Sequence, residues 1–332
     1  MTGPRRRLTA LALALLLMAA GGCSSSGGKR AEQQAARFGA GVADTPRMKI
    51  AMVTHAAEGD TFWDLIRKGA EAAAAKDNVQ LVYSSAVQAG DQANLVEQAL
   101  AQDVDGMALT LAKPDAMKGV VAKARAAGVP VVAFNAGLDQ WKDLGVLEYF
   151  GQDETLAGRT AGERLAAEGA RKVLCVIQEQ GHVALEARCA GVARGMAGRS
   201  VENLNVTGTD MPSVRSAITG KLMQDPAIDR VITLGAPFAL TAVQSVRDAG
   251  STAQVVTFDT NKALVAAVKS GDVLWAIDQQ PYLQGYLAVD SLWLYKSNGN
   301  VMGGGQTVLT GPSFIDETNV AEISQYADRG TR

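Results

Sequence analysis

MKIAMVTHAAEGDTFWDLIRKGAEAA (Met48–Ala73) and RKVLCVIQEQGHVALEARCAGVARGM (Arg171–Met196) follow the same pattern. Each stretch begins with a continuous apolar run, continues through a loop that contains a histidine, and enters a segment with apolar residues at helical spacing. Continuous apolar runs are typical of strands that are covered on both faces. The two stretches therefore predict two α/β lobes that begin alike, with His55 and His182 at equivalent positions.

The same alternation of strand and helix continues through the rest of the chain. Segments such as DTFWDLIRKGAEAAAA and DAMKGVVAKARAAG have helical periodicity and separate the strand-like runs. This repetition predicts an α/β fold with parallel sheets and right-handed crossovers. Ligands bind such sheets at the carboxyl ends of the strands, so the loops there are the first place to search. The ten strand-like runs are KIAMVT, VQLVYSS, GMALTL, VPVVAFN, LEYFGQ, KVLCVIQ, NLNVTGT, RVITLG, QVVTFD and LWAIDQ.

The composition is that of a soluble globular protein. Hydrophobic residues make up 47% of the 332 residues and charged residues 20%, which excludes wholesale disorder and agrees with two domains. The formal net charge is -2 at pH 7. A mildly acidic chain without a basic block is not typical of nucleic-acid-binding proteins, so we expect no nucleic-acid partner.

The N-terminal residues have the features of an export signal. A basic segment, MTGPRRR, precedes an apolar segment, LTALALALLLMAA, and small residues then lead to Cys23. This order resembles a bacterial lipoprotein signal, with Ala20 where leucine is usual. We expect a lipoprotein signal peptide over residues 1–22, lipidation of Cys23, and a flexible tether over residues 23–46. The alternative is an ordinary secretory signal peptide with an incidental cysteine.

The sequence lacks the patterns of catalysis and metal binding. It contains no GxSxG, HExxH or P-loop pattern, and GAG at Gly39–Gly41 precedes the first strand instead of following one. No CxxC or His-rich spacing predicts a metal site. We therefore expect a protein without catalytic residues, cofactor or metal, and not an enzyme.

Cys175 and Cys189 are the two cysteines outside the signal region. An exported compartment permits a disulfide between them. Their small and apolar surroundings favour two packed thiols instead.

Six motifs, in order along the chain, carry a resemblance to a known family: TFWDLIRKGAEAAA, GVPVVAFN, FGQDETLAG, GHVALEAR, VVTFDTN and AIDQQPYLQG. Together they resemble the periplasmic sugar-binding proteins of the ribose and galactose type, the receptors of ABC importers. The resemblance implies two Rossmann-like lobes, joined by three crossovers, that close on one small ligand. The implied first lobe comprises residues 47–150 plus 281–306, and the second lobe residues 151–280 plus 307–332.

The resemblance also implies ligand contacts in the first lobe. Phe62 and Trp63 match an aromatic pair that stacks on a sugar ring, although helix core explains one of the two equally well. Asp60 matches a polar contact, and it also stands where a helix N-cap is expected. Asn135 follows VVAF at a position where the family normally has Asp, and its amide can both donate and accept.

In the second lobe the resemblance is closest to the galactose type. His182 and Arg188 in GHVALEAR match a sugar-contacting histidine and arginine, and the planar fork of the arginine suits adjacent hydroxyls. Asp259 at the end of VVTFD matches an acidic contact. The alternative, that Asp259 caps the next helix, is less favoured because the residues after it can perform that task. Gln279 at the end of WAIDQ matches a contacting glutamine at a crossover.

Some positions depart from the family pattern. Ala136, Gly235 and Ala236 stand where relatives have polar contacts, so the ligand need not be ribose. His55 either lines the cleft or only ends its strand. One acidic contact and one arginine contact nearly balance in charge, which favours a neutral monosaccharide or polyol.

The expected function follows from these implications. The protein is expected to be a monomeric solute-binding protein, lipid-anchored on the extracytoplasmic side of the cell membrane, that delivers its ligand to an ABC permease. The alternative is a sensor that presents a sugar or an autoinducer-like molecule to a membrane receptor. A cytoplasmic sugar-responsive repressor shares this fold, but it needs a helix-turn-helix where this chain has an export signal.

Overall fold

The computed structural model describes residues 42–332, and residues Thr45–Arg332 form one compact unit. The expected signal peptide, Cys23 and most of the expected tether lie outside the described residues. Within the part that is described, no helix is both long and apolar enough to cross a membrane.

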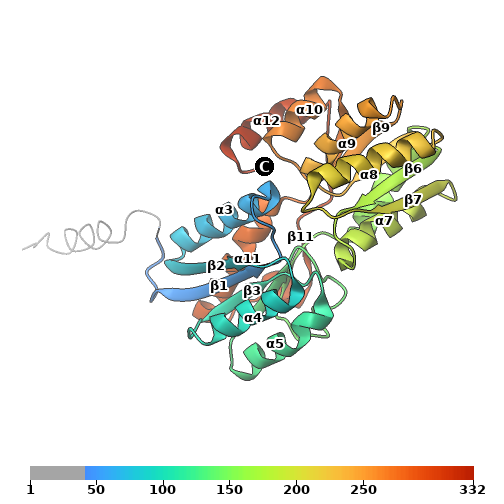
Figure 1. The fold of residues 1–332 in the computed structure, drawn as a ribbon. Helices are drawn as coiled ribbons and strands as arrows, with labels where there is room; N and C mark the ends of the chain where they lie inside the picture. Colours follow the sequence, from blue (N-terminus) through green and yellow to red (C-terminus); the bar gives the residue numbers. More distant parts are fainter. Residues whose placement is uncertain (1–41) are drawn as a thin grey trace, which may run out of the picture. The chain divides into compact units, whose positions relative to one another are not determined.

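Two six-stranded sheets form the centre of this unit (Figure 1). We call each sheet with its helices a lobe. In sheet order, the first lobe contains β11 (Val308–Leu309), β5 (Tyr149–Gly151), β4 (Val131–Phe134), β3 (Gly106–Leu109), β1 (Met48–Thr54) and β2 (Val79–Ser85). The second lobe contains β12 (Ser313–Asp316), β10 (Val273–Asp278), β9 (Gln254–Phe258), β8 (Arg230–Thr233), β6 (Lys172–Ile177) and β7 (Ser200–Asn205).

Helices cover both faces of each sheet, as continuous apolar strands require. In the first lobe one face carries α3 (Thr61–Lys76) and α11 (Pro281–Asn298), and the other carries α4 (Ala89–Leu100) and α5 (Pro114–Ala126). In the second lobe one face carries α6 (Glu154–Ala167) and α7 (Val183–Gly195). Its other face carries α8 (Met211–Gln224), α9 (Ala236–Asp248), α10 (Lys262–Ser270) and α12 (Val320–Arg329). A short 3-10 helix, η1 (Met302–Gly305), precedes β11.

The strand order confirms the predicted α/β fold of two similar lobes. Strands β1 to β5 and β6 to β10 occupy the same places in their sheets, and each of the ten predicted runs overlaps a strand. Two short strands, β11 and β12, were not predicted, and β12 pairs with β10 in antiparallel orientation. Strand β7 ends at Asn205 instead of continuing through NLNVTGT, and Thr207–Thr209 form a loop that lines the cavity described below.

The chain passes between the sheets three times: between β5 and α6, between β10 and α11, and between β11 and β12. Two passages differ from the expected divisions. Gly151 is the last residue of β5, so the first division falls after it and not at 150/151, and the third differs from the expected 306/307. Val308 pairs with Phe150 and Leu309 with Gly151, so these two residues belong to the first sheet. The division therefore falls after Leu309.

Two pairs of helices pack with their backbones in contact, α3 with α11 and α6 with α7. A Cβ added at Gly69 of α3 would lie 1.9 Å from the carbonyl oxygen of Tyr282. A Cβ added at Gly158 of α6 would lie 2.1 Å from the carbonyl oxygen of Arg188. Glycine at these positions therefore sets the short distance between the helices. In each pair one helix, α3 or α7, carries predicted ligand contacts.

Cys175 of β6 and Cys189 of α7 are joined by a disulfide, with their Cα atoms 5.9 Å apart. Two packed thiols were favoured from the sequence, and this prediction was wrong. The apolar context was read correctly, because both residues are buried in the same core layer between β6 and α7. Burial on one layer is also what brings the two sulfur atoms within bonding distance.

Candidate functional site

A cavity of about 500 Å³ lies between the lobes, at the carboxyl ends of the strands and the first turns of α3, α7 and α9. Its size suits a small ligand. The structure brings all eight predicted ligand-binding residues into its wall: Asp60, Phe62, Trp63, Asn135, His182, Arg188, Asp259 and Gln279.

The start of α3 supplies the aromatic part of the wall. Trp63 is 8% exposed and packs in the core of the first lobe, whereas Phe62 is only half-buried and meets the Trp63 ring edge-on, with centroids 5.2 Å apart. Phe62 is therefore the better placed of the two to stack on a ligand. Asp60 combines both of its predicted roles, since it lines the cavity and its Oδ1 accepts a 3.0 Å hydrogen bond from the Phe62 amide as the N-cap. Burial raises the pKa of Asp60.

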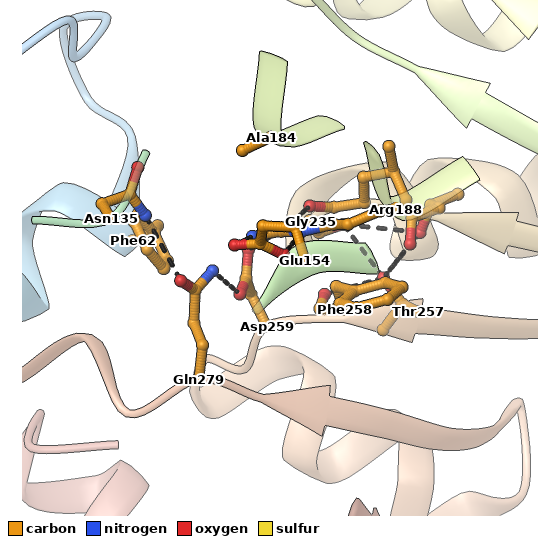
Figure 2. Close-up of polar contacts among 12 residues, drawn as sticks. Phe62, Asn135, Glu154, Ala184, Arg188, Gly235, Thr257, Phe258, Asp259 and Gln279 are labelled. Carbon is orange, nitrogen blue, oxygen red and sulfur yellow. Dashed lines mark hydrogen bonds and ion pairs between the residues drawn. The ribbon is translucent and has the colours of Figure 1, made fainter. Parts of the chain in front are cut away.

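A row of hydrogen bonds connects three residues of the cavity wall that come from both lobes (Figure 2). Asn135 Nδ2 donates to Gln279 Oε1 over 3.3 Å, and Gln279 Nε2 donates to Asp259 Oδ1 over 2.7 Å. Asn135 and Asp259 follow the equivalent strands β4 and β9, and both have left-handed backbones, with φ of 67° and 64°. Asn and Asp tolerate this conformation better than most residues, which accounts for their use at these positions.

Asp259 is not needed to cap the following helix. Asn261 performs this task, because its Oδ1 accepts a hydrogen bond from the Leu264 amide over 2.8 Å. Burial of Asp259 raises its pKa to about 7, although the nearby Arg188 acts in the opposite direction. The carboxyl group is thus buried, faces the cavity and titrates near neutrality.

Arg188 is held by a partner that the sequence analysis missed. Its Nε and Nη2 donate to Glu154 Oε2 and Oε1 over 2.5 and 3.0 Å (Figure 2). Its Nη1 donates to the Leu234 carbonyl over 3.1 Å. Asp259 Oδ2 lies 3.9 Å from Nη1. Each Nη atom retains one further N–H, so Arg188 can still donate to a ligand, but its charge is already paired.

The two histidines of the chain meet between the lobes. His55 Nε2 and His182 Nε2 are 3.0 Å apart. The Ala184 amide donates to His182 Nδ1, so neutral His182 carries its proton on Nε2 and donates to His55. His55 then carries its proton on Nδ1 and donates to Thr110 Oγ1 over 2.8 Å.

This arrangement requires both rings to be neutral. Burial, aided by the positive charge of Lys113, lowers the pKa of His55 to about 3, and burial lowers the pKa of His182 well below its usual value. Both nitrogens of His182 are occupied by the protein, so the contact that it offers a ligand is its ring surface. The histidines are also not at equivalent positions, since His55 directly follows β1 and His182 is the N-cap of α7.

His55, His182 and Glu179 form a cluster of three metal-ligating groups whose atoms lie within 4.8 Å of one another. Two histidines and a carboxylate are a common zinc set. A histidine that binds metal through Nε2 needs its proton on Nδ1, and Nδ1 of His182 faces the Ala184 amide as an acceptor. The hydrogen bonds of this cluster therefore do not fit a metal.

The charges around the cavity leave no unpaired cation among the described residues. Lys113 and Glu179, from opposite lobes, form an ion pair of 2.9 Å, and Arg188 is paired with Glu154. Two acids, Asp60 and Asp259, complete the set of charged residues at the cavity. One acid and one arginine were expected to balance nearly in charge. Because both cations are paired and two further acids face the cavity, its net charge is more negative than expected.

The two lobes and the cavity between them agree with a known protein family. A family model described as a periplasmic binding protein domain matches residues 50–300. The chain belongs to the periplasmic binding protein family. The resemblance that we drew from the six motifs is thereby confirmed.

The periplasmic binding protein also has relatives of known ligand. It is 56% identical to a solved carbohydrate transporter from Acidothermus cellulolyticus 11B in complex with myo-inositol, with a TM-score of 0.85, over 86% of this chain and 100% of that chain. It is 27% identical to the xylose/arabinose-binding protein XylF of Sulfolobus acidocaldarius, over 84% of this chain and 73% of the relative. It is 29% identical to the D-ribose/D-allose-binding protein of Pseudomonas aeruginosa, over 72% of this chain and 79% of the relative.

The second lobe of this periplasmic binding protein has an aromatic wall that the sequence analysis missed. Phe238 lines the cavity from α9. A Cβ at Gly235 would lie 3.3 Å from its ring, and a Cβ at Gly208 would lie 3.1 Å from it. The ring thus fills space beside Gly235, where the family pattern has a polar side chain. A phenylalanine one turn after a strand-end glycine is a signal that could have been recognised.

Apart from Glu179 Oε1, which forms the ion pair with Lys113, two polar atoms of the wall have no hydrogen-bond partner within the described protein. They are Gln178 Oε1, after β6, and Thr260 Oγ1, after β9. Buried polar atoms are normally paired. Both positions follow the carboxyl ends of strands, and their types alone did not distinguish them from ordinary loop residues.

Proposed function

We propose that this periplasmic binding protein captures a neutral monosaccharide or polyol between its lobes and delivers it to an ABC importer. Myo-inositol is the first ligand to test, because the relative with 56% identity was solved in complex with it. The observation that carries the proposal is the cavity wall itself. It combines the Asn135–Gln279–Asp259 row of donors and acceptors with aromatic faces from both lobes, and it has no unpaired cation among the described residues.

A neutral polyol matches each part of this wall. Its hydroxyls can donate to Asp259 and to the unpaired Gln178 Oε1 and Thr260 Oγ1, and they can accept from the remaining N–H groups of Arg188. Its C–H faces can contact the Phe62 and Phe238 rings. A carboxylated or phosphorylated sugar would instead bring negative charge toward two acids.

The test is a thermal-shift screen followed by calorimetry with myo-inositol, pentoses, hexoses, linear polyols, and the anionic sugar D-glucuronate. A neutral ligand at 100 times its dissociation constant should raise the free energy of unfolding by about 2.7 kcal/mol. Asp259→Asn and Arg188→Ala should each weaken binding at least tenfold, about 1.4 kcal/mol. Asp272→Asn, on the exposed surface, is the matched control. Binding of D-glucuronate alone, with every neutral compound inactive, would contradict the proposal.

We further propose that the protein is a monomer without enzymatic activity, lipid-anchored through Cys23 on the extracytoplasmic side, with an ABC permease as its partner. The anchor is supported by the order of basic, apolar and small residues before Cys23. Cys23→Ser should release the protein from the membrane fraction and leave ligand affinity unchanged. Retention of the variant in that fraction would refute the anchor.

A further inference from the structure

Glu154 is a buried carboxylate directly behind a residue of the cavity wall. It is the first residue of α6 and only 5% exposed, and both of its oxygens contact the Arg188 guanidinium. A planar two-point contact fixes the orientation of an arginine as well as its position. Glu154 is not among the described residues that line the cavity, so it reaches a ligand only through Arg188.

The surroundings leave this pair little freedom. Gly158, one turn after Glu154, lies against the backbone of Arg188, where a Cβ would come within 2.1 Å of the carbonyl oxygen. The disulfide ties Cys189, the next residue along α7, to strand β6. Gln152 Nε2 donates to Glu154 Oε2 over 2.8 Å. The carboxylate is therefore held in place beside Arg188, outside the cavity wall.

The charge of this carboxylate bears on which ligands the cavity accepts. Lys113 is already paired with Glu179. Asp259 lies 3.9 Å from the Arg188 guanidinium, so Glu154, outside the wall, is the acid in direct contact with this cation. Without a partner, a buried guanidinium would attract an anionic ligand strongly, because charge interactions are weakly screened there. With Glu154 in contact, the pair is neutral and still presents N–H donors.

We propose that Glu154 is a positioning residue that determines specificity: it orients Arg188 toward ligand hydroxyls and cancels its charge, so that the cavity accepts neutral polyols and rejects anionic sugars. This inference rests on the proposed function. It adds a residue outside the cavity wall as a further source of the discrimination, beside the two acids at the cavity.

The test compares calorimetric affinities for myo-inositol and D-glucuronate in the wild type and in three variants of α6. The wild type should bind myo-inositol at least 100-fold more tightly than D-glucuronate. Measured well above pH 7, where Asp259 is ionised in both proteins, Glu154→Gln should weaken myo-inositol binding about tenfold, without weakening D-glucuronate, so the ratio contracts at least tenfold. Glu154→Asp keeps the charge but shortens the side chain, so both affinities should fall while the ratio stays within about threefold of the wild type. Glu163→Gln, an exposed carboxylate on the same helix, should change neither affinity.

The pH profile provides a readout that packing alone would not change. Asp259 faces Arg188, Glu154 and Asp278, and the charge of Glu154 helps to raise the pKa of Asp259. An ionised carboxylate accepts stronger hydrogen bonds, so myo-inositol affinity should rise as the pH increases through about 7. The midpoint should move to lower pH in Glu154→Gln and stay in place in Glu154→Asp and Glu163→Gln.

The outcomes separate the inference from the proposed function. A wild type that binds none of the neutral sugars or polyols refutes the function, and the inference with it. A wild type that binds myo-inositol, with an unchanged ratio and midpoint in Glu154→Gln, refutes the inference alone. If Glu154→Gln does not fold, Glu154→Asp decides: a contraction of its ratio by tenfold or more overturns the charge argument.

Discussion

The histidine pair between the lobes should make the folded protein sensitive to acid. Both rings must be neutral for His182 to donate to His55 and for His55 to donate to Thr110. In the unfolded chain each histidine is protonated below its usual pKa of 6.5, whereas in the fold the pKa of His55 is about 3 and that of His182 is well below 6.5. The unfolded state therefore binds more protons below pH 6.5, and stability is lost as the pH falls through this range.

The size of the effect follows from these pKa values. Each histidine that must stay neutral costs about 1.36 kcal/mol per pH unit below 6.5, which amounts to about 2 kcal/mol between pH 7 and pH 5. His182→Asn removes one such group, and Asn remains a good N-cap for α7. The difference in unfolding free energy between wild type and variant should therefore shrink by about 2 kcal/mol between pH 7 and pH 5.

Urea denaturation of both proteins at several pH values measures this difference. Asp259 acts with the opposite sign, since its pKa is raised to about 7, but its contribution is common to both proteins and cancels. His55→Asn, at the other end of the contact, should show the same dependence. A difference between wild type and His182→Asn that stays constant from pH 7 to pH 5 would refute the assignment of two neutral rings.

Three further predictions concern the wall, the disulfide and the helix contact. Phe62→Leu should weaken binding of the neutral ligand about tenfold in calorimetry and change the unfolding free energy by less than about 1 kcal/mol, because the ring is only half-buried; equal affinity would mean that Phe62 does not stack on the ligand. Removing the disulfide with Cys175→Ala and Cys189→Ala should lower the unfolding free energy by about 3 kcal/mol, the value for a loop of this length; chemical denaturation that matches the wild type would contradict this. Gly158→Ala should destabilise by about 1–3 kcal/mol through overpacking, whereas Gly220→Ala, in open space on α8, should stabilise by up to about 1 kcal/mol; similar melting temperatures for the two variants would refute the close contact.

The fold could be predicted largely from the sequence because its strands are buried on both faces. Their continuous apolar runs stand out from the helical segments, and ten of the strands were found in this way. Strands β11 and β12 contain two and four residues and carry no such run. They exist because an adjacent strand, β5 or β10, offers them backbone partners. A pairing of this kind has no local signature.

The candidate site was predictable where a residue stands at the end of a strand or in the first turn of a helix. Asp259 and Asn135 were found for this reason. Glu154 also begins a helix, but its importance lies in its contact with Arg188, 34 residues later. The pairing of His55 with His182 spans 127 residues. Such contacts depend on how the two lobes meet, and a pattern read along one strand or helix does not contain that information.

The three passages between the sheets also determine when this protein can finish folding. Helix α11, which covers the Gly69 face of α3, and strand β11, which completes the first sheet, both follow the whole β6 to β10 region in the chain. During synthesis the elements from β1 to β5 are therefore made while one face of α3 has no covering helix and β5 has no partner strand on its outer edge. Neither lobe can be cut out as a continuous fragment, and a chain truncated before residue 308 would leave β5 as an exposed edge. The first lobe is therefore complete only after its last strand, β11, has been synthesised.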